Sequence, residues 1–588
     1  MSRPWNLWVA GILVSLLAAV YSLAARSVPF CQRADEAVFI LIGRALRSGQ
    51  APTSVDPLPG YPLLLAFPDW LLSPHWGWYW ILGVIPSLLT VTLIWRLYSR
   101  LLPPKTALAA FLLSAFHPLM TSFAGAVLPD ILYTGLAILV FLLADRSART
   151  KNAPVALLAL AGALAALVRP EGAWLVLCAG MVLCLGNRIK EALLFGVFSL
   201  APDALWLLRD MRLHHQLTGY ASHWRAQASA AAGTQWHIAA AWLADILGQT
   251  FWDIPALWPR ALRLLLGIAA LLACIRGARV LLASSRDPHS RRLCFGIAAY
   301  LIGLFCLHLT WTAIAPRYFL HFLPFLWLFV VAGLDFPTLR LRNPALILGG
   351  IIFISFLASD LRLARPGLSS PRGAALPKTI SWIDNNTPPT AVFQSLVWPT
   401  LRLLANRTAY PSGTVPLRDY WMSAILSRGI SYIHVIDIIP DGFFTPEMAE
   451  TVRSERHWAQ SSPYIKKVFA SLSERSMIFK VSHPDPRRYL SAMNLLQRAV
   501  DRLAKGQNVE QVRHELIESA KIEPSLSAPW QMLAGIERNP QKRLAYLEKA
   551  AAAEPESRPI RAAMESARHA LVIEGAHTRH GRAFRDPL

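Results

Sequence analysis

The sequence is poor in charged residues and has no recognisable cysteine motif. Only 16% of its 588 residues are charged, whereas soluble globular domains carry about 25%, so an ordinary soluble enzyme is excluded. The six cysteines form no CxxC pair and no Cys/His metal spacing, and none follows Cys306. A disulfide framework and thiol redox chemistry are therefore excluded for the C-terminal part of the chain.

The charge is also unevenly distributed. Residues 1–362 are about 12% charged and residues 363–588 about 23%, which predicts a membrane domain followed by a soluble part. A net charge of +22 would suggest a nucleic-acid partner in a soluble protein. Membrane proteins, however, collect Lys and Arg in their cytoplasmic loops, and the C-terminal part has no basic run. We therefore predict a lipid bilayer and no nucleic acid as partner.

The N-terminal part contains eleven apolar stretches that are candidates for membrane-spanning helices, each of which needs about 20 residues. They cover residues 5–25, 77–96, 106–124, 128–144, 153–168, 172–187, 191–208, 257–283, 293–312, 316–334 and 344–361. We interpret the first as an uncleaved span, because no convincing small-residue cleavage site precedes Arg26.

The loop charges predict the orientation. With the N-terminus inside, the cytoplasmic loops hold 16 basic and four acidic residues, as the positive-inside rule requires. An odd number of spans then places the C-terminal part outside, in the periplasm of a Gram-negative cell. The prediction is a multi-pass protein of the cytoplasmic (inner) membrane.

The first outward loop, roughly residues 26–76, carries an acidic pair on a predicted helix from Asp35 to Gly49. A second short helix is predicted from Tyr61 to Leu72, and both helices can lie at the membrane interface. Asp35 is a candidate general base for an acceptor hydroxyl. The alternative is that Asp35 and Glu36 only cap their helix.

Three polar residues near predicted membrane boundaries are further candidates. Arg169 and Arg317 are the only basic residues in their outward connections, and a guanidinium suits phosphate oxygens. The alternatives are snorkelling toward lipid headgroups and, for Arg169, an ion pair with Glu171. Asp203 lies in the last turns of the seventh span, where a polar group is usually functional or paired.

Histidines give no firm metal site. The second outward loop, roughly residues 209–256, contains His214, His215, His223 and His237 without a fixed ligand spacing, so a solvated loop is favoured over a metal or acceptor site. We interpret His117 and His308, within spans, as packing residues. No cofactor is predicted, and no chelating cluster supports a divalent metal.

Residues 1–360 resemble the GT-C glycosyltransferases, in the branch of protein O-mannosyltransferases and lipid A aminoarabinose transferases. The matching segments, in family order, are Arg33–Glu36 (RADE), Pro59–Pro62 (PGYP), Leu128–Asp130 (LPD), Val168–Gly172 (VRPEG) and Pro316–Tyr318 (PRY) with Pro324. The resemblance implies that Asp35 is the catalytic acid of the first loop and that Asp130 is an acidic residue at the outward start of the fourth span. It also implies a polyprenyl-phosphate donor, for which Arg317 and Tyr318 are the best candidate contact. Ala37 and Val38 depart from the family, where aromatic residues often follow the acidic pair.

The soluble part is predicted to contain two regions and a tail. Residues 363–482 are typical of an extracytoplasmic α/β domain, with a helix at 380–385 and strands at 391–396, 432–439 and 476–481. Residues 483–574 resemble degenerate tetratricopeptide (TPR) repeats, because Leu516, Ser519 and Pro524 recur as Leu547, Ala550 and Pro555. This TPR-like region either binds a protein partner or is a plain helical cap. Residues 575–588 are predicted to be disordered.

The resulting hypothesis is a GT-C glycosyltransferase, hexosyl or pentosyl, that moves a sugar from a polyprenyl-phosphate donor to a protein, lipid or glycan acceptor outside the cell membrane, with inversion. Its candidate site residues are Asp35, Glu36 and Asp130 for catalysis, Arg317, Tyr318 and Arg169 for the donor phosphate, and Asp56, Tyr61, Glu171 and Asp203 for the acceptor or sugar. Two alternatives stay open. One is a lipid or glycan transporter or flippase, which the few midplane charges do not favour, and the other is an inactive scaffold of an envelope complex.

Overall fold

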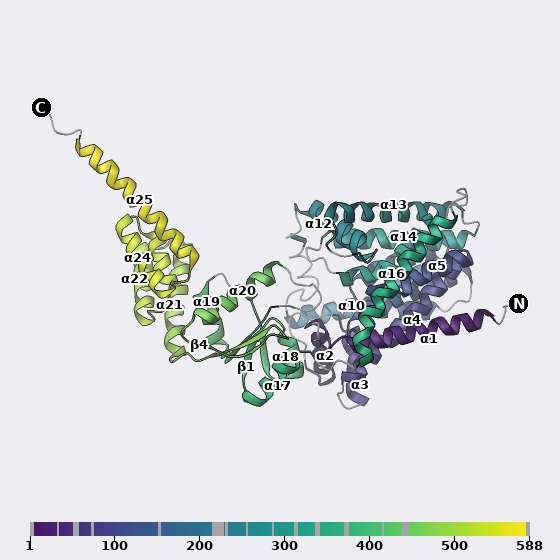
Figure 1. The fold of residues 1–588 in the computed structure, drawn as a ribbon, viewed down its shortest axis with the longest axis horizontal. Coiled ribbons are helices and arrows are strands. Elements are labelled where there is room, and N and C mark those ends of the chain that lie inside the picture. Colours follow the sequence, from purple (N-terminus) through teal and green to yellow (C-terminus); the bar gives the residue numbers. More distant parts are fainter. Residues whose placement is uncertain are drawn as a thin grey trace. The chain divides into compact units, whose positions relative to one another are not determined.

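The chain forms two compact units (Figure 1). One holds Met1–Ala375, here called the membrane unit, and the other holds Leu376–Ile439 and Phe444–Leu588, here called the C-terminal unit. The computed structural model describes residues 5–31, 34–50, 58–71, 76–150, 155–214, 228–229, 233–254, 257–284, 287–310, 316–334, 342–369, 375–413, 417–437 and 446–583.

Helices occupy every stretch that the sequence predicts as a span. They are α1 (Trp5–Ser27), α4 (Trp76–Leu101), α5 (Pro104–Ala115), α6 (Pro118–Phe123), α7 (Pro129–Arg149), α8 (Val155–Val168), α9 (Glu171–Leu185), α10 (Ile189–His214), α13 (Arg260–Ser284), α14 (Pro288–His308), η2 (Pro316–His321), α15 (Leu323–Leu334) and α16 (Arg342–Ser369). In the described part of the chain, five helices are long and apolar enough to cross a membrane by themselves. The total of eleven spans stays a prediction.

Three of the predicted spans differ from the observed helices by more than a small shift of their ends. The third span is divided into α5 and α6, because Pro118 cannot continue the preceding helix and the ring of His117 accepts a hydrogen bond from the Leu119 N–H at 3.1 Å instead. The tenth begins as the 3₁₀ helix η2 before α15. Helix α16 continues to Ser369, so the domain boundary that we predicted at residue 362 falls inside a helix.

Both expected interface helices are present in the first outward loop. Helix α2 (Ala34–Arg47) packs closely on α3 (Gly60–Leu71), and a Cβ atom at Gly43 would lie 2.5 Å from the Pro62 carbonyl oxygen. Gly49, with φ +70°, follows the end of α2 in the left-handed conformation that favours glycine. The second outward loop contributes α12 (Gln235–Ala241) and the π-helix η1 (Trp242–Thr250).

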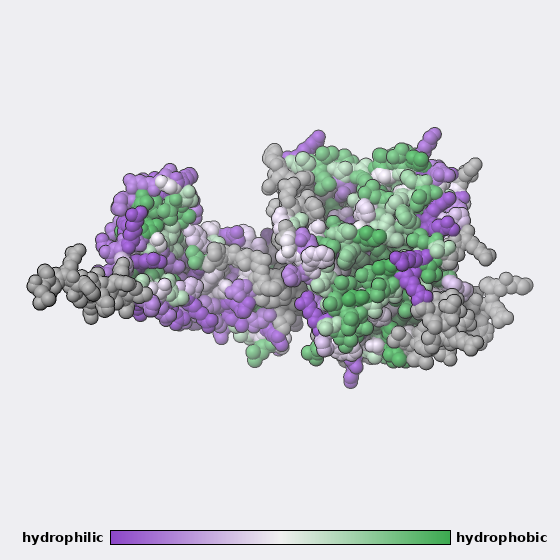
Figure 2. All heavy atoms as spheres, turned by 90° about the horizontal axis from the view of Figure 1, so that it is seen from above, coloured by the Kyte–Doolittle hydropathy of each residue, from purple (hydrophilic) through white to green (hydrophobic). Residues whose placement is uncertain are grey.

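The surface of the membrane unit is apolar over wide areas (Figure 2). Helix α10 alone exposes Leu193, Val197, Phe198 and Leu205 by more than 60% each. Contiguous apolar surface of this kind is unusual in a soluble monomer and is expected of a helix that faces lipid.

The C-terminal unit is built on a five-stranded sheet of order β2-β1-β3-β5-β4. Strand β1 (Val392–Ser395) is parallel to β2 (Thr408–Pro411) and β3 (Tyr432–Ile436), and β5 (Ser476–Val481) is antiparallel to β3 and β4 (Ile465–Ser471). The sheet is accompanied by α17 (Pro377–Asn386), α18 (Trp398–Leu404), α19 (Arg418–Ser427) and α20 (Pro446–Ser461). The three strands that the sequence predicts are thus present, and β2 and β4 were not predicted.

Five helices complete the C-terminal unit: α21 (Pro486–Ala504), α22 (Val509–Ile522), α23 (Ala528–Ile536), α24 (Pro540–Ala553) and α25 (Arg558–Ala583). They share one hydrophobic core with the sheet, in which Trp421 and Phe479 meet Leu496 and Leu516. Helix α25 continues to Ala583, so residues 575–583 are helical where we expected disorder. The TPR identity of these helices stays a prediction.

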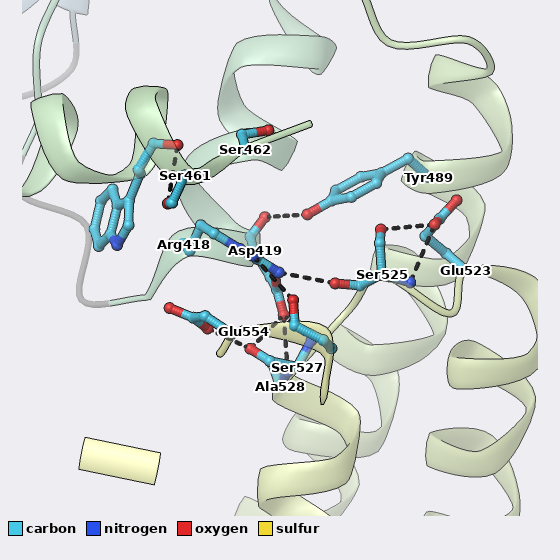
Figure 3. Close-up of polar contacts among 12 residues, drawn as sticks. Arg418, Asp419, Ser461, Ser462, Tyr489, Glu523, Ser525, Ser527, Ala528 and Glu554 are labelled. Carbon is cyan, nitrogen blue, oxygen red and sulfur yellow. Dashed lines mark hydrogen bonds and ion pairs between the residues drawn. The ribbon is translucent and has the colours of Figure 1, made fainter. Parts of the chain in front are cut away.

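A polar junction fixes these helices to the sheet domain (Figure 3). The buried Asp419 carboxylate accepts hydrogen bonds from the Ser527 N–H at 2.7 Å and the Ala528 N–H at 2.8 Å, at the start of α23. Arg418 donates to the backbone oxygens of Ser525 and Ala553. The TPR-like region therefore packs on the α/β domain.

Candidate active site

A cavity of about 340 Å³ lies in the membrane unit at the N-terminal ends of α2, α7 and α9. It is lined by Asp35, Phe39, Leu58, Leu128, Pro129, Asp130, Arg169, Pro170, Glu171, Asp203, Leu207, Leu307, His308, Arg317 and Tyr318. The lining thus gathers polar residues that the sequence separates by up to 283 positions. Of the ten candidate site residues predicted from the sequence, seven line this one cavity.

Three of its carboxylates lie in the first turns of helices. Asp35 belongs to the first turn of α2, Asp130 to that of α7 and Glu171 to that of α9. The N-terminus of a helix stabilises negative charge through its dipole and its unpaired N–H groups. Pro129 occupies the first turn of α7, where a missing N–H costs nothing. The local sequence therefore favours carboxylates at this place.

Arg317 and Asp35 form an ion pair at the cavity. The Arg317 Nη1 atom donates to Asp35 Oδ2 at 2.5 Å, and Nη2 donates to the Tyr318 hydroxyl at 3.2 Å. The Asp35 side chain is 46% exposed and that of Arg317 is 19% exposed. The predicted base and the predicted phosphate contact are therefore partners of each other in this structure.

Arg169 has a different setting. Its Nη1 atom donates to Asp130 Oδ1 at 2.8 Å, and its Nη2 and Nε atoms donate to the two Glu171 oxygens at 2.8 and 3.1 Å. None of the three side chains is more than 7% exposed. Arg169 thus binds both carboxylates. The ion pair with Glu171 is the one that the sequence offered as the alternative to a phosphate contact.

Two histidines join the site. His308, which we interpreted as a packing residue, lines the cavity, and its Nδ1 atom donates to the Leu304 carbonyl at 2.8 Å. His321, which belongs to none of the sequence motifs, is fully buried with Nε2 3.5 Å from Asp130 Oδ1. In the sequence, its position four residues after Arg317 could have marked it as a candidate site residue.

The remaining candidates lie elsewhere. Glu36 is buried, and its carboxylate accepts from the Val127 N–H at 3.0 Å. Tyr61 is buried with its ring edge against Phe39, at a centroid distance of 5.4 Å. Neither residue is among those that line the cavity. Their positions therefore do not support a direct role in catalysis for Glu36 or in sugar binding for Tyr61. Asp56 lies outside the described residues.

Within the described ranges, no group of three or more His, Cys, Asp or Glu side chains is arranged to hold a metal ion. Of the second-loop histidines, His215 and His223 lie outside those ranges. The titratable groups identified at this site are therefore its arginines, carboxylates and histidines.

The arrangement of the helices is similar to that of a solved GT-C glycosyltransferase, as the sequence resemblance predicts. The chain is similar to the crystal structure of ArnT, a lipid A aminoarabinose transferase, from Cupriavidus metallidurans in the apo state. The TM-score is 0.50 and the identity 12%, over 82% of this chain and 100% of ArnT. For the same ArnT bound to undecaprenyl phosphate, the TM-score is 0.50 and the identity 12%, over 81% and 99% of the two chains.

A cryo-EM structure of the arabinofuranosyltransferase AftD from Mycobacteria also matches. The identity is 15% over 82% of this chain and 42% of AftD, with a TM-score of 0.38. No family model matches the sequence, and no curated protein matches it. The likeness to ArnT therefore establishes the fold.

Proposed function

We propose that this protein is a membrane glycosyltransferase that moves a hexosyl or pentosyl group from a polyprenyl-phosphate donor to an acceptor on the outer face of the cytoplasmic membrane. One observation carries the proposal. Asp35, Asp130 and Arg317, which three separate sequence motifs supply, line a single cavity. The fold and the undecaprenyl phosphate bound to ArnT support the same donor class.

The proposed reaction is a direct displacement. The acceptor hydroxyl gives its proton to the Asp35 carboxylate, and its oxygen forms a bond to the anomeric carbon of the sugar. The bond from that carbon to the donor phosphate oxygen breaks, and the phosphate leaves with the electron pair. Attack opposite the leaving group inverts the anomeric carbon.

Arg317 is the proposed contact for the leaving phosphate. Its guanidinium lies at the cavity, where its partners include the half-exposed Asp35 carboxylate and the Tyr318 hydroxyl. Guanidinium groups stabilise phosphate charge that develops in a transition state. Arg169 instead holds Asp130 and Glu171 in place. Asp203 stays a candidate for a sugar or acceptor hydroxyl, since its carboxylate also lines the cavity.

The proposed orientation places this cavity outside. Arg100, Asp145, Arg149 and Asp287, all assigned to cytoplasmic loops by the charge rule, are in mutual contact at the other end of α7. About 19 residues of helix separate Asp130 from Arg149, or ~28 Å at 1.5 Å per residue. That length matches the ~30 Å of a bilayer core.

The test is transfer of labelled sugar from a polyprenyl-phosphate donor by membranes that contain the Asp35→Asn variant. We expect transfer to fall by about 10³-fold or more, because the proton acceptor is lost. Asp287→Asn is the matched control, since it removes an aspartate paired with arginine at the far end of α7. Unchanged transfer in Asp35→Asn removes Asp35 from the mechanism, and translocation of the lipid without sugar transfer favours the transporter alternative.

A further inference from the structure

The two arginines at the cavity differ in how firmly their partners hold them. Arg169 makes three hydrogen bonds to two carboxylates that are 2% and 6% exposed. Arg317 donates at 2.5 Å to a carboxylate that is 46% exposed, and at 3.2 Å to the neutral Tyr318 hydroxyl. Water can replace a bond to a half-exposed group, whereas separating a buried ion pair leaves its charges uncompensated. Only the Arg317 pair is therefore suited to exchange.

The charge of the described cavity lining favours such an exchange when an anionic ligand binds. Among the described residues, four carboxylates line the cavity, Asp35, Asp130, Glu171 and Asp203, against two guanidinium groups, Arg169 and Arg317. A phosphate that enters this lining meets excess negative charge, and the cation best placed to bind it is already bonded to Asp35. Phosphate and Asp35 are thus competitors for one guanidinium.

Resting on the proposed function, we propose that the donor phosphate displaces Asp35 from Arg317, so that donor binding itself releases the base. Before binding, Asp35 Oδ2 accepts from Arg317 and is engaged. After the exchange, phosphate oxygens accept from Arg317, and both Asp35 oxygens are available to an acceptor hydroxyl. The pair therefore imposes an order in which the donor binds before the acceptor reacts.

The proposal makes an unusual prediction for binding. A variant that loses catalysis should bind the lipid phosphate more tightly, because the competitor for Arg317 is gone. We expect Asp35→Asn, in the full-length protein in nanodiscs, to bind undecaprenyl phosphate about 10-fold more tightly than the wild type, measured by microscale thermophoresis. Asp35→Ser should show the same gain, since serine also suits the first turn of a helix.

Two further variants separate exchange from a general charge effect. Asp203→Asn removes a carboxylate from the same lining, and the Oδ1 atom of Asp203 is buried without a hydrogen-bond partner among the described residues. We expect its gain to stay within about 2-fold, because the Oδ1 atom of Asp203 holds no donor that the phosphate would have to win from it. In Arg317→Ala, adding Asp35→Asn should give no gain, since there is no guanidinium left to compete for.

The outcomes are distinct. Equal or weaker binding by both Asp35 variants overturns the exchange, as does an equal gain in Asp203→Asn or a gain that persists without Arg317. Absence of undecaprenyl phosphate binding by wild type and variants alike contradicts the proposed donor class, and the exchange falls with it. Tighter binding by the Asp35 variants that depends on Arg317 establishes the competition.

Discussion

The two ends of helix α7 carry clusters of arginines and carboxylates that differ in exposure. At its start, Arg169 binds Asp130 and Glu171 where all three side chains are at most 7% exposed. At its end, Arg149 and Arg100 share Asp145 and Asp287; Asp145 is 7% exposed, but both arginines and Asp287 are 28–38% exposed. The first cluster lines a cavity, and the second joins the ends of α4 and α7 to the beginning of α14.

The difference shows what burial does to an ion pair. Exposed pairs are screened by water and contribute about 0–1 kcal/mol each. Buried charges have lost their hydration, so each depends on its partner and cannot be changed alone. The exposed cluster therefore tolerates substitution, while the buried cluster maintains a fixed arrangement of charge beside the Asp35–Arg317 pair.

The largest expected effect follows from removing the cation of the buried cluster. Arg169→Met leaves two uncompensated buried carboxylates, and we expect a loss of about 3–5 kcal/mol in stability. The measurement is thermal unfolding of the full-length protein in detergent. A triple variant that adds Asp130→Asn and Glu171→Gln should recover most of the loss, because no unpaired charge remains. Equal melting temperatures for Arg169→Met and Arg149→Met would show that the two clusters contribute equally to stability.

The sequence predicted much of this arrangement. The apolar stretches and loop charges located the helices, and the short motifs around Asp35, Asp130, Arg169 and Arg317 identified residues that meet at one cavity. Those signals are local, because an apolar stretch and the residues that begin a helix lie close together in the sequence.

The pairings among those residues could not be predicted, because they depend on how distant helices pack. The sequence offered Arg169 as a candidate phosphate contact or as a partner of Glu171, but its bonds to both Asp130 and Glu171 require α7 and α9 to begin side by side. His308 was read as packing because nothing in α14 indicates a cavity. Strand β4 was missed because the exposed Lys466 and Lys467 interrupt its apolar pattern.

A buried carboxylate in the C-terminal unit sharpens the comparison, because no described arginine forms an ion pair with it. Glu455 in the C-terminal unit accepts from the Gln394 amide at 2.5 Å and the Ser412 hydroxyl at 2.9 Å. Burial raises its pKa from 4.5 to about 7, although these hydrogen bonds lower it in part. Without a cation, a buried carboxylate holds its proton instead of its charge.

The sign of the pH dependence follows from that shift. The folded state binds the Glu455 proton more tightly than the unfolded state, so its contribution is full below pH 4.5 and is lost as the pH rises to about 7. We expect local stability around β1 and α20 to fall by ~1–3 kcal/mol across this range. Hydrogen exchange of the full-length protein measures it, and Glu455→Gln should remove the dependence. A pH-independent wild type would contradict the assignment.

The smallest expected effect is at the exposed end of α7. Arg149→Ala removes its contacts with Asp145 and Asp287, while Arg100 still reaches both carboxylates. We expect less than about 1 kcal/mol of destabilisation, and that loss should shrink in high salt because the pair is screened. Thermal unfolding at two salt concentrations measures both quantities. A salt-independent loss as large as that of Arg169→Met would contradict the comparison. It would mean that the two clusters contribute equally to stability and that the exposure of an ion pair does not determine its contribution.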